Sequence, residues 1–507
     1  MAGTLARRAA WLASAKALAF ALGFALPLIL VRTLSQTEFG IYKQVFLLLN
    51  TGMTILPLGF AMSAFYFLPR CERGRASSRL VFNIAIFHLA VGGAAALALV
   101  AFPGALAAIF ASHELVGYAP ALALLGFLAI GTSFLEIIAV ANGEVALAAR
   151  LIVLTNLVKT ILLLGAAWLA PTIEALIAAA TINCLGQAAL LFWYLDSRFP
   201  RFWAAGDWRM MRAQLGYALP LGAAAMLSMA QLDLHSYFVA RSFDAATFAI
   251  YAVGCFQLPF LYIVNESVGA VMIPAVGRLQ REGQPSEIVG LIASMMRKLG
   301  AMYFPLYAGL IVTGREFITV LFTDSYRASW PIFAVNLTLI PLCMLTAACD
   351  PVLRAYPSYT AVLVRIRVVL IAVLALGLWA VTARHWLLGA ILVMVGVNLI
   401  DRIVVSTMLA RMLEMRWRDL ALFRDVAKLA LAATVAALAA EGMRALLSGA
   451  APLVVLAAAG ATVAVVYVPM VWILGVPTPA ELAALRRRAV GAGLGFALPS
   501  AQARVER

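Results

Sequence analysis

Ionisable side chains that interrupt long apolar stretches are the residues of this sequence best placed to do chemistry. A charge in the middle of a membrane costs about 2.5 to 3.5 kcal/mol on an insertion scale, so it is expected to face a water-filled cavity or an opposite charge. Cations in such a cavity could bind an anionic group such as a phosphate. The basic members of this set are Lys16, Lys159, Arg365, Arg367 and Arg402. We predict that they bind an anionic substrate.

Lys159 has the most unusual position among these cations. It is one of only five lysines in the chain, and the apolar stretch that contains it begins near residue 150. Lys159 is therefore about nine residues, or roughly 13 Å, inside a helix that rises 1.5 Å per residue. A side chain at this depth extends to the membrane surface less easily than Lys16 or Arg365, which could both do so. We expect Lys159 to face a cavity.

Acidic and amide side chains lie in the same stretches. Asp233 and Glu266 are the deeper carboxylates. They are predicted to bind a proton or a sodium ion, or to pair with the cations. Asn156 and Asn398 are predicted to contact sugar hydroxyls, although each could equally join two helices by hydrogen bonds. The same two interpretations hold for three further amides: Asn183, Asn265 and Asn336.

The sequence lacks the common motifs of catalytic, metal and nucleotide sites. Its four histidines form no HExxH motif, there is no GxxxxGK[ST] loop, and its five cysteines form no CxxC pair. The glycines of GAGLG at 491–495 lack the strand and helix that a dinucleotide site requires. We therefore predict no catalytic residue, no metal and no cofactor, and we do not expect an enzyme.

The composition of the chain indicates the class of protein in which these side chains lie. Only 12% of the 507 residues are charged and 64% are hydrophobic, with a mean hydropathy of +0.98. Average soluble proteins have about 25% charged residues, so a soluble globular protein is excluded. The net charge of +15 comes from arginines in short segments between apolar runs, which indicates membrane topology rather than a nucleic-acid partner.

Apolar runs of membrane-spanning length recur along the whole chain. The sequence predicts fourteen spans, at 10–31, 43–68, 80–110, 117–141, 150–170, 172–195, 214–240, 247–273, 298–321, 330–350, 359–381, 386–410, 426–446 and 452–475. Arginines gather in alternate connections, and the positive-inside rule places those connections in the cytoplasm. Both termini are then cytoplasmic, which requires an even number of spans.

The two halves of the chain share a repeated pattern. Four residues recur at a displacement of 209 positions, each time between the first and second spans of a six-span block: Arg32, Phe39, Ile41 and Tyr42 match Arg241, Phe248, Ile250 and Tyr251. A displacement by an even number of spans predicts a parallel repeat, with an axis along the membrane normal. We therefore predict an all-α membrane protein of two six-helix lobes and two further helices.

This architecture gives five predicted regions. Residues 1–195 form a first lobe and 214–411 a second lobe, joined by a cytoplasmic linker at 196–213 in which aromatic and basic residues suit a membrane interface. Two extra spans follow at 412–475, and a cytoplasmic tail at 476–507. In the tail, Thr478, Pro479 and Glu481 resemble the capping box of a short helix.

Several segments in this order resemble one known family. They are LVRTLSQTEFGIYKQ in the first hairpin, ANGEVALAARLIVLTNLVK between spans four and five, and MAQLDLHSYFVARSFDAATFAIY in and after span seven. With the six, six and two arrangement, they resemble the polysaccharide or lipid-linked oligosaccharide flippase branch of the multidrug/oligosaccharidyl-lipid/polysaccharide exporter superfamily. The sequence departs from the family in one place, because Asp233 is followed by Leu234 and His235, where the family often has a basic residue.

The resemblance implies a flippase that moves a polyprenyl-pyrophosphate-linked oligosaccharide across a bacterial inner membrane by alternating access. Its partners would be that substrate, membrane lipids, a coupling H⁺ or Na⁺, and a polysaccharide polymerase. A multidrug exporter of the same superfamily is one alternative, although it would favour acidic rather than mixed spans. A membrane polymerase or ligase of surface polysaccharide assembly is another, and the shortness of the predicted periplasmic loops disfavours it.

Overall fold

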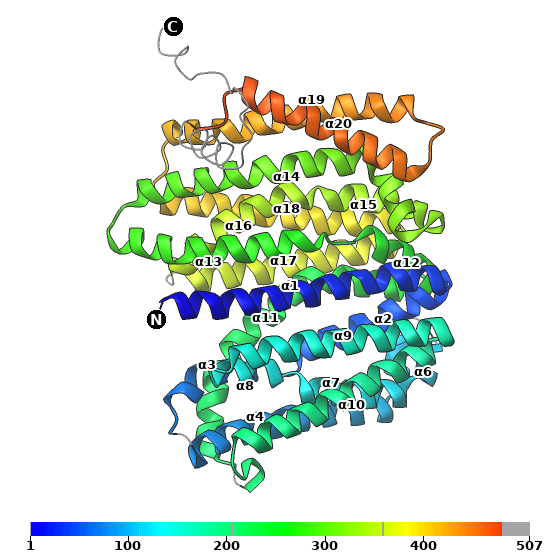
Figure 1. Cartoon of the computed structure of the whole chain (residues 1–507), viewed down its shortest axis with the longest axis vertical. Helices are drawn as coiled ribbons and strands as arrows, with labels where there is room; N and C mark the ends of the chain where they lie inside the picture. Colours follow the sequence, from blue (N-terminus) through cyan, green and yellow to red (C-terminus); the bar gives the residue numbers. More distant parts are fainter. Residues whose placement is uncertain are drawn as a thin grey trace. The chain divides into compact units, whose positions relative to one another are not determined.

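The computed structural model describes residues 2–72, 74–110, 112, 114–204, 206–356 and 359–478. Every regular element in this part of the chain is a helix (Figure 1), which confirms the predicted all-α membrane class. The N-terminal half contains α1 (Ala2–Thr33), α2 (Gln36–Ile55), η1 (Phe60–Met62), α3 (Ser63–Phe67), η2 (Leu68–Arg70), α4 (Arg75–Ala101), α5 (Gly104–Phe110), α6 (Glu114–Gly117), α7 (Ala119–Thr132), α8 (Leu135–Ala141), α9 (Val145–Leu169), α10 (Ile173–Arg198) and η3 (Phe202–Ala204).

The C-terminal half continues the helical pattern. It contains α11 (Trp208–Ser242), α12 (Ala245–Gly254), α13 (Pro259–Arg281), α14 (Pro285–Phe322), η4 (Asp324–Ser329), α15 (Trp330–Leu337), α16 (Leu339–Ala355), α17 (Thr360–Thr382), α18 (Leu387–Met412), η6 (Trp417–Phe423), α19 (Arg424–Leu446) and α20 (Pro452–Ile473). The short helix predicted to begin after Thr478 lies outside the described residues.

The number of membrane-spanning helices is close to the prediction. Among the described residues, twelve helices are long and apolar enough to cross a membrane, or thirteen if the bent pair Gln36–Ile55 and Phe60–Arg70 forms one span. The difference from fourteen lies at 247–273, where α12 is only ten residues long and α13 starts after a break at 255–258. Pro259 explains this break, because a proline lacks the amide hydrogen that a continuous helix would need there.

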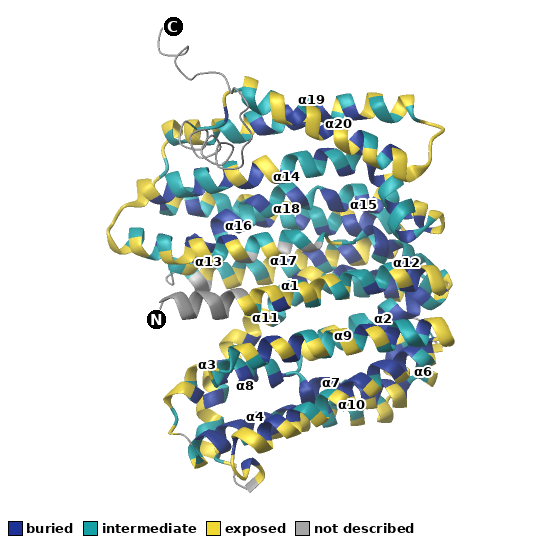
Figure 2. Ribbon diagram, viewed as in Figure 1, coloured by how far each residue is buried: buried dark blue, intermediate teal, exposed yellow. Residues whose placement is uncertain are grey.

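Apolar side chains cover the outward faces of many helices. Leu97, Trp168 and Leu438 are 73%, 81% and 71% exposed, and α4 shows buried residues on one face with exposed residues on the other (Figure 2). A water-soluble protein rarely exposes so much continuous apolar surface. Exposure of this kind is what contact with lipid requires.

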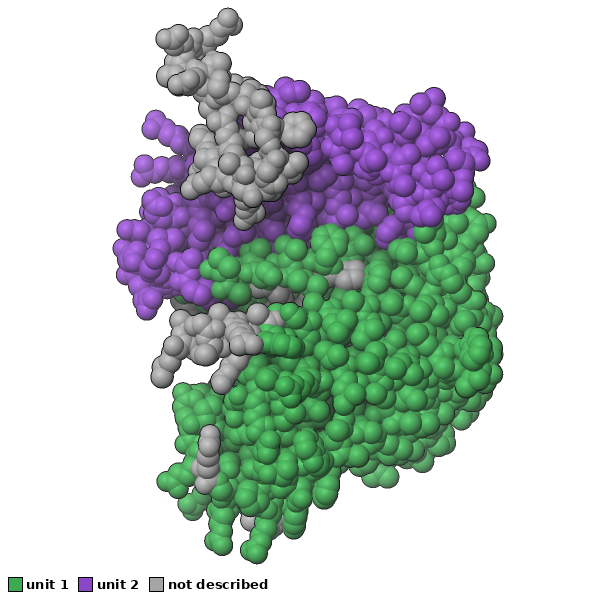
Figure 3. Space-filling model, viewed as in Figure 1, with its two compact units in different colours: residues 1–271, 318–339, 353–405 green, residues 272–317, 340–352, 406–507 purple. Residues whose placement is uncertain are grey.

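The chain divides into two compact units (Figure 3). Unit 1 comprises residues 1–271, 318–339 and 353–405, and unit 2 comprises 272–317, 340–352 and 406–507. Within unit 2, α19 lies along α20 (Figure 1), and their contact is made largely by buried alanines such as Ala432, Ala436 and Ala459. Small residues let helices approach closely in membranes. The lobe boundaries near 195, 213, 411 and 475 stay a prediction.

Unit 1 contains the linker predicted at 196–213, and the linker is fastened to α4. Phe199 and Phe202 are buried in the core of unit 1, whereas Trp203 and Trp208 are 54% and 73% exposed. The Asn83 side chain donates to the carbonyl of Asp207 (3.0 Å) and accepts from its amide (3.2 Å). The two exposed tryptophans therefore suit a membrane interface, while the two phenylalanines do not reach it.

The first hairpin starts its second helix earlier than the sequence predicted. Ser35 accepts a hydrogen bond from the amide of Glu38 (3.2 Å), and the Glu38 carboxylate accepts one from the amide of Ser35 (2.8 Å). This capping box begins α2 at Gln36, seven positions before the predicted boundary at 43. As a result, Lys43 lies two turns inside α2 and not at the start of a span.

Side chains of this hairpin also hold the end of another helix. The Arg32 guanidinium donates to the carbonyls of Val320 and Leu321 (both 2.7 Å), which lie in the last turn of α14, where backbone carbonyls have no partner within the helix. The Gln36 amide donates to the carbonyl of Ser325 (2.6 Å). These bonds fix the turn between α1 and α2 against the segment 318–339 of unit 1.

Candidate functional site

Unit 1 contains a polar cavity of about 360 Å³ that is open on one side. Its walls come from α1, α2, α9, α11, α12, α15 and α18, and from the break after α12. The polar lining residues are Tyr42, Lys43, Asn50, Asn156, Lys159, Thr160, Asp233, His235, Ser236, Cys255, Gln257 and Asn336. Because these helices are apolar elsewhere, such a concentration of polar groups marks the place where a polar ligand would be accommodated.

The internal repeat is built around this cavity. Lining residues occur as equivalent pairs that are each 209 positions apart: Gly23 with Leu232, Leu26 with His235, Pro27 with Ser236, Lys43 with Ala252, and Phe46 with Cys255. The repeat thus extends from the four identities seen in the sequence to the faces of α1 and α11, and of α2 and α12. Equivalent positions of the two repeats carry different side chains. The two repeats therefore contribute matching positions to the cavity wall but different chemical groups.

Two lysines from different helices provide the positive charge. Lys159 Nζ lies 5.8 Å from the ring centroid of Phe46, and Lys43 Nζ lies 5.3 Å from that of Phe39. Both distances are within the range of a cation–π contact, and the rings of Tyr42 and Phe46 are themselves 4.5 Å apart. An aromatic group on α2 therefore holds two ammonium groups without neutralising them.

The second half of the repeat provides an acid and an imidazole. Asp233 and His235 both lie on α11 and line the cavity. His235 is 4% exposed, and its Nδ1 forms a 2.8 Å hydrogen bond with the hydroxyl of Tyr251 on α12. This hydrogen bond joins α11 to α12, two residues along α11 from Asp233. Two lysines against one aspartate give the lining an excess of positive charge.

The amides of the cavity also support its walls. Asn156 donates to the carbonyl of Ile152 on its own helix (2.9 Å), and Asn336 on α15 donates to the carbonyl of Phe256 (3.0 Å), within the break after α12. A broken helix leaves backbone carbonyls to be satisfied, so Asn336 stabilises the break. Asn336 thus joins α15 to the segment after α12, whereas the Asn156 bond stays within α9. Contact of either amide with a polar ligand stays a prediction.

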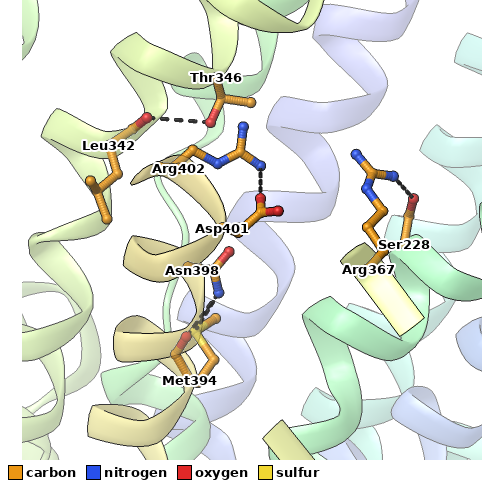
Figure 4. A network of polar contacts seen from close by, with 8 residues as sticks. All are labelled: Ser228, Leu342, Thr346, Arg367, Met394, Asn398, Asp401 and Arg402. Atoms are coloured by element: carbon orange, nitrogen blue, oxygen red, sulfur yellow. Dashed lines mark hydrogen bonds and ion pairs between the residues drawn. The ribbon is translucent and has the colours of Figure 1, made fainter. Parts of the chain in front are cut away.

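Several predicted residues whose side chains are described are not part of this lining, among them Lys16, Arg365, Arg367, Arg402 and Asn398. Lys16 forms a 2.8 Å ion pair with Glu136, with side chains 58% and 38% exposed. In Figure 4, Arg367 donates to the hydroxyl of Ser228 (3.2 Å), and Asn398 donates to the carbonyl of Met394 (2.9 Å). Arg365 is exposed. Glu266 lies on α13, and its side chain is outside the described residues.

Arg402 forms the tightest pair of this set. Its Nη2 lies 2.5 Å from Oδ2 of Asp401, and the side chains are only 12% and 2% exposed (Figure 4). A buried charge of this kind is stable only with a partner of opposite sign. The pair neutralises Arg402 within α18, one turn from Asn398 and two turns from Met394, which lines the cavity.

Sequence reasoning missed Lys43 and assigned no role to His235 in the cavity. Lys43 is the first residue of the second span as predicted, 43–68, and so did not stand out as a charge inside a span. The capping box of Ser35 and Glu38 is visible in the sequence SQTE and would have placed Lys43 inside the helix. His235 could have been found by the repeat, since it matches Leu26, an apolar position of span one.

Comparisons with solved structures show which fold this is. The chain is similar to "Lipid II flippase MurJ, inward closed conformation", with a TM-score of 0.70 and 14% identity, over 91% of this chain and 98% of that one. It is also similar to an inward-facing multidrug resistance MATE family transporter of the MOP superfamily, with a TM-score of 0.56 and 12% identity, over 80% and 95% of the two chains. At these identities the similarity shows the fold alone.

A third solved structure is also similar in fold. It is a MOP superfamily transporter from Pyrococcus furiosus, with a TM-score of 0.51 and 13% identity, over 80% of this chain and 95% of that one. No curated protein matches the chain in sequence.

The family itself is established by sequence. The model of the family described as "Polysaccharide biosynthesis protein" matches residues 29–331, which is more than half of the chain. The match includes all the cavity-lining residues except those of α1, α15 and α18. The match confirms the resemblance predicted from the hairpin and span-seven segments. The chain belongs to the polysaccharide biosynthesis protein family.

Proposed function

We propose that this protein moves a polyprenyl-pyrophosphate-linked oligosaccharide across the bacterial inner membrane by alternating access. The substrate would be a repeat unit of O-antigen, capsule or exopolysaccharide. The observation that carries the proposal is the pair Lys43 and Lys159, which line one cavity from two helices, α2 and α9. The family match supports a role in polysaccharide assembly.

The charge of the cavity fits the head group of such a substrate. A pyrophosphate carries several negative charges and cannot cross lipid without a polar environment. Ammonium groups bind phosphate oxygens by charge-assisted hydrogen bonds, which are about twice as strong as neutral ones. Lys43 and Lys159 would hold the pyrophosphate, while Asn50 and Gln257 offer amide groups to the sugars. The polyprenyl chain would stay in the surrounding lipid.

The position of the cavity fits alternating access. Many transporters bind their substrate between two repeats, which then rock against each other around a fixed site. Here the equivalent faces of α1 and α11, and of α2 and α12, line the same cavity. We further propose that Asp233 binds a coupling H⁺ or Na⁺ and that a polysaccharide polymerase receives the product.

We also propose that both termini are cytoplasmic. A reporter fused after Arg418 should then report from the cytoplasm, and a periplasmic signal would contradict this topology.

A multidrug exporter is the second candidate function. Asp233 lines the same cavity and could bind a cationic drug, and the chain shares its fold with a multidrug transporter. Two lysines in the lining oppose this function, because they would repel a cation.

Binding of two probes of opposite charge separates the two functions. We expect the purified protein in nanodiscs to bind a short isoprenyl pyrophosphate at least tenfold more tightly than tetraphenylphosphonium, since each ammonium contact with a phosphate contributes about 1.5 to 3 kcal/mol. Titration of each probe against the wild-type protein measures this ratio. Preference for the phosphonium cation would favour the multidrug exporter.

A further inference from the structure

An aromatic group outside the cavity is not explained by the functions described so far. Tyr66 of α3 and Tyr217 of α11 stack with ring centroids 5.1 Å apart and an interplanar angle of 25°. The Arg70 guanidinium lies 3.9 Å from the Tyr66 ring centroid, and Phe67 meets both tyrosines edge-on. Tyr66 and Tyr217 are 41% and 37% exposed. We call Tyr66, Arg70 and Tyr217 the tyrosine platform.

The platform is held rigidly by a buried hydrogen bond. The Gln214 side chain donates to the hydroxyl of Ser63 (3.2 Å) and accepts from the Asn83 amide (3.2 Å), and all three residues are at most 1% exposed. Ser63 and Gln214 each lie three positions before a platform tyrosine, on the same side of its helix. The buried bond therefore fixes α3 against α11 directly beside the stacked rings, which preorganises them for a ligand.

The platform lies in line with the cavity along one helix. Tyr217 and His235 are 18 positions apart in α11, with Pro220 between them. In a regular helix this spacing is five full turns, which puts both residues on one face about 27 Å apart. Ser228, which receives the hydrogen bond from Arg367, lies on this face between them. One face of α11 thus carries an exposed aromatic group at one end, an arginine contact in its middle and the cavity at the other end.

We propose that the tyrosine platform binds a sugar ring of the lipid-linked oligosaccharide, at a subsite separate from the cavity. The C–H groups on one face of a pyranose are weakly positive and apolar, and they pack against the negative face of an aromatic ring. Arg70 and Tyr217 both lie against the Tyr66 ring, while Tyr217 keeps 37% of its surface exposed, so we place the sugar on the Tyr217 ring. The Arg70 guanidinium adds donors for hydroxyl or carboxylate groups. This inference rests on the proposed function.

The experiment compares two probes that differ only in the sugar. A short isoprenyl pyrophosphate, and the same compound bearing N-acetylglucosamine, are titrated against the full-length protein in nanodiscs. Because stacking requires only the flat C–H face of a pyranose, wild type should bind the sugar-bearing probe about threefold to tenfold more tightly. Tyr217→Leu should abolish that difference and leave the affinity for the sugar-free probe unchanged, whereas Tyr217→Phe should retain it.

Two further variants keep the test decisive. Trp168→Leu removes another exposed aromatic ring, on α9, and should retain the full sugar effect. Tyr66→Leu removes the ring beneath Tyr217 and should reduce the effect, which provides a second measurement if Tyr217→Leu does not fold. A sugar effect that persists in both leucine variants would assign the tyrosines to membrane anchoring and overturn the subsite.

The outcomes distinguish this inference from the proposed function. If wild type binds the sugar-free pyrophosphate but gains nothing from the sugar, the subsite is wrong and the proposed function stands. If wild type does not bind the sugar-free pyrophosphate, the proposed function is wrong and the subsite falls with it.

Discussion

Replacing Lys159 by alanine is expected to weaken binding of a lipid-linked pyrophosphate by about tenfold to hundredfold, because a hydrogen bond to a charged group contributes about 1.5 to 3 kcal/mol. Transport at low substrate concentration should fall by the same factor. Lys159→Arg should retain part of the activity, since it keeps the charge but changes the geometry of the contact. Flipping by the purified variants in proteoliposomes, at equal protein content, measures the effect.

A second lysine provides the matched control. Lys428 pairs with Asp425 on α19 (3.4 Å) and lies in unit 2, outside the cavity lining. Lys428→Ala removes the same charge from the protein and should leave both affinity and flipping unchanged. If Lys159→Ala flips its substrate as fast as wild type, Lys159 is a structural residue and the assignment of the phosphate site is wrong.

Replacing Gly40 by alanine is expected to disrupt the crossing between the two repeated hairpins. A Cβ atom at Gly40 would lie 1.9 Å from the carbonyl oxygen of Ala245, at the point where α2 meets α12. Neither backbone can accommodate that contact, so the helices must separate, and overpacking of this kind costs about 1 to 3 kcal/mol. Because Tyr42, Lys43 and Phe248 line the cavity from the same two helices, transport should fall together with stability.

The control for Gly40 is a glycine with room for a side chain. Gly165 lies within α9, and a Cβ atom there would meet nothing within 4 Å. Gly165→Ala should leave stability unchanged or raise it by about 0.5 to 1 kcal/mol, as expected for alanine in a helix interior. Thermal unfolding in detergent and flipping in proteoliposomes report both variants. A Gly40→Ala protein that unfolds at the wild-type temperature and flips at the wild-type rate would show that the crossing is not tight.

The sequence was most informative where a charged residue lies within a long apolar run. Lys159 stands out because a lysine nine residues into an apolar run is too deep to reach the membrane surface easily, and the structure places it on the cavity lining. The 209-residue repeat, seen first as four identities, also describes the walls of the cavity. The helical class follows from the length of the apolar runs, since about 20 residues cross a membrane as a helix whereas a barrel strand needs only about 10.

Contacts between distant segments were not predictable in the same way. Lys16 and Glu136 are 120 positions apart, and only the packing of the helices brings their side chains to 2.8 Å. The tyrosine platform joins α3 to α11 across about 150 residues and leaves no local pattern. The start of α2 at Gln36 and the break before Pro259, in contrast, have local signals in the sequence, a capping box and a proline.

The most direct test of the account is transport itself. Wild-type protein is reconstituted in liposomes that contain a polyprenyl-pyrophosphate-linked oligosaccharide, and the sugar that reaches the opposite leaflet is measured with a reagent that cannot cross the membrane. On the proposed function, we expect sugar to appear at a rate proportional to the amount of protein, and free pyrophosphate to compete by occupying the site of Lys43 and Lys159. A rate no greater than that of protein-free liposomes, with the protein folded, would contradict it.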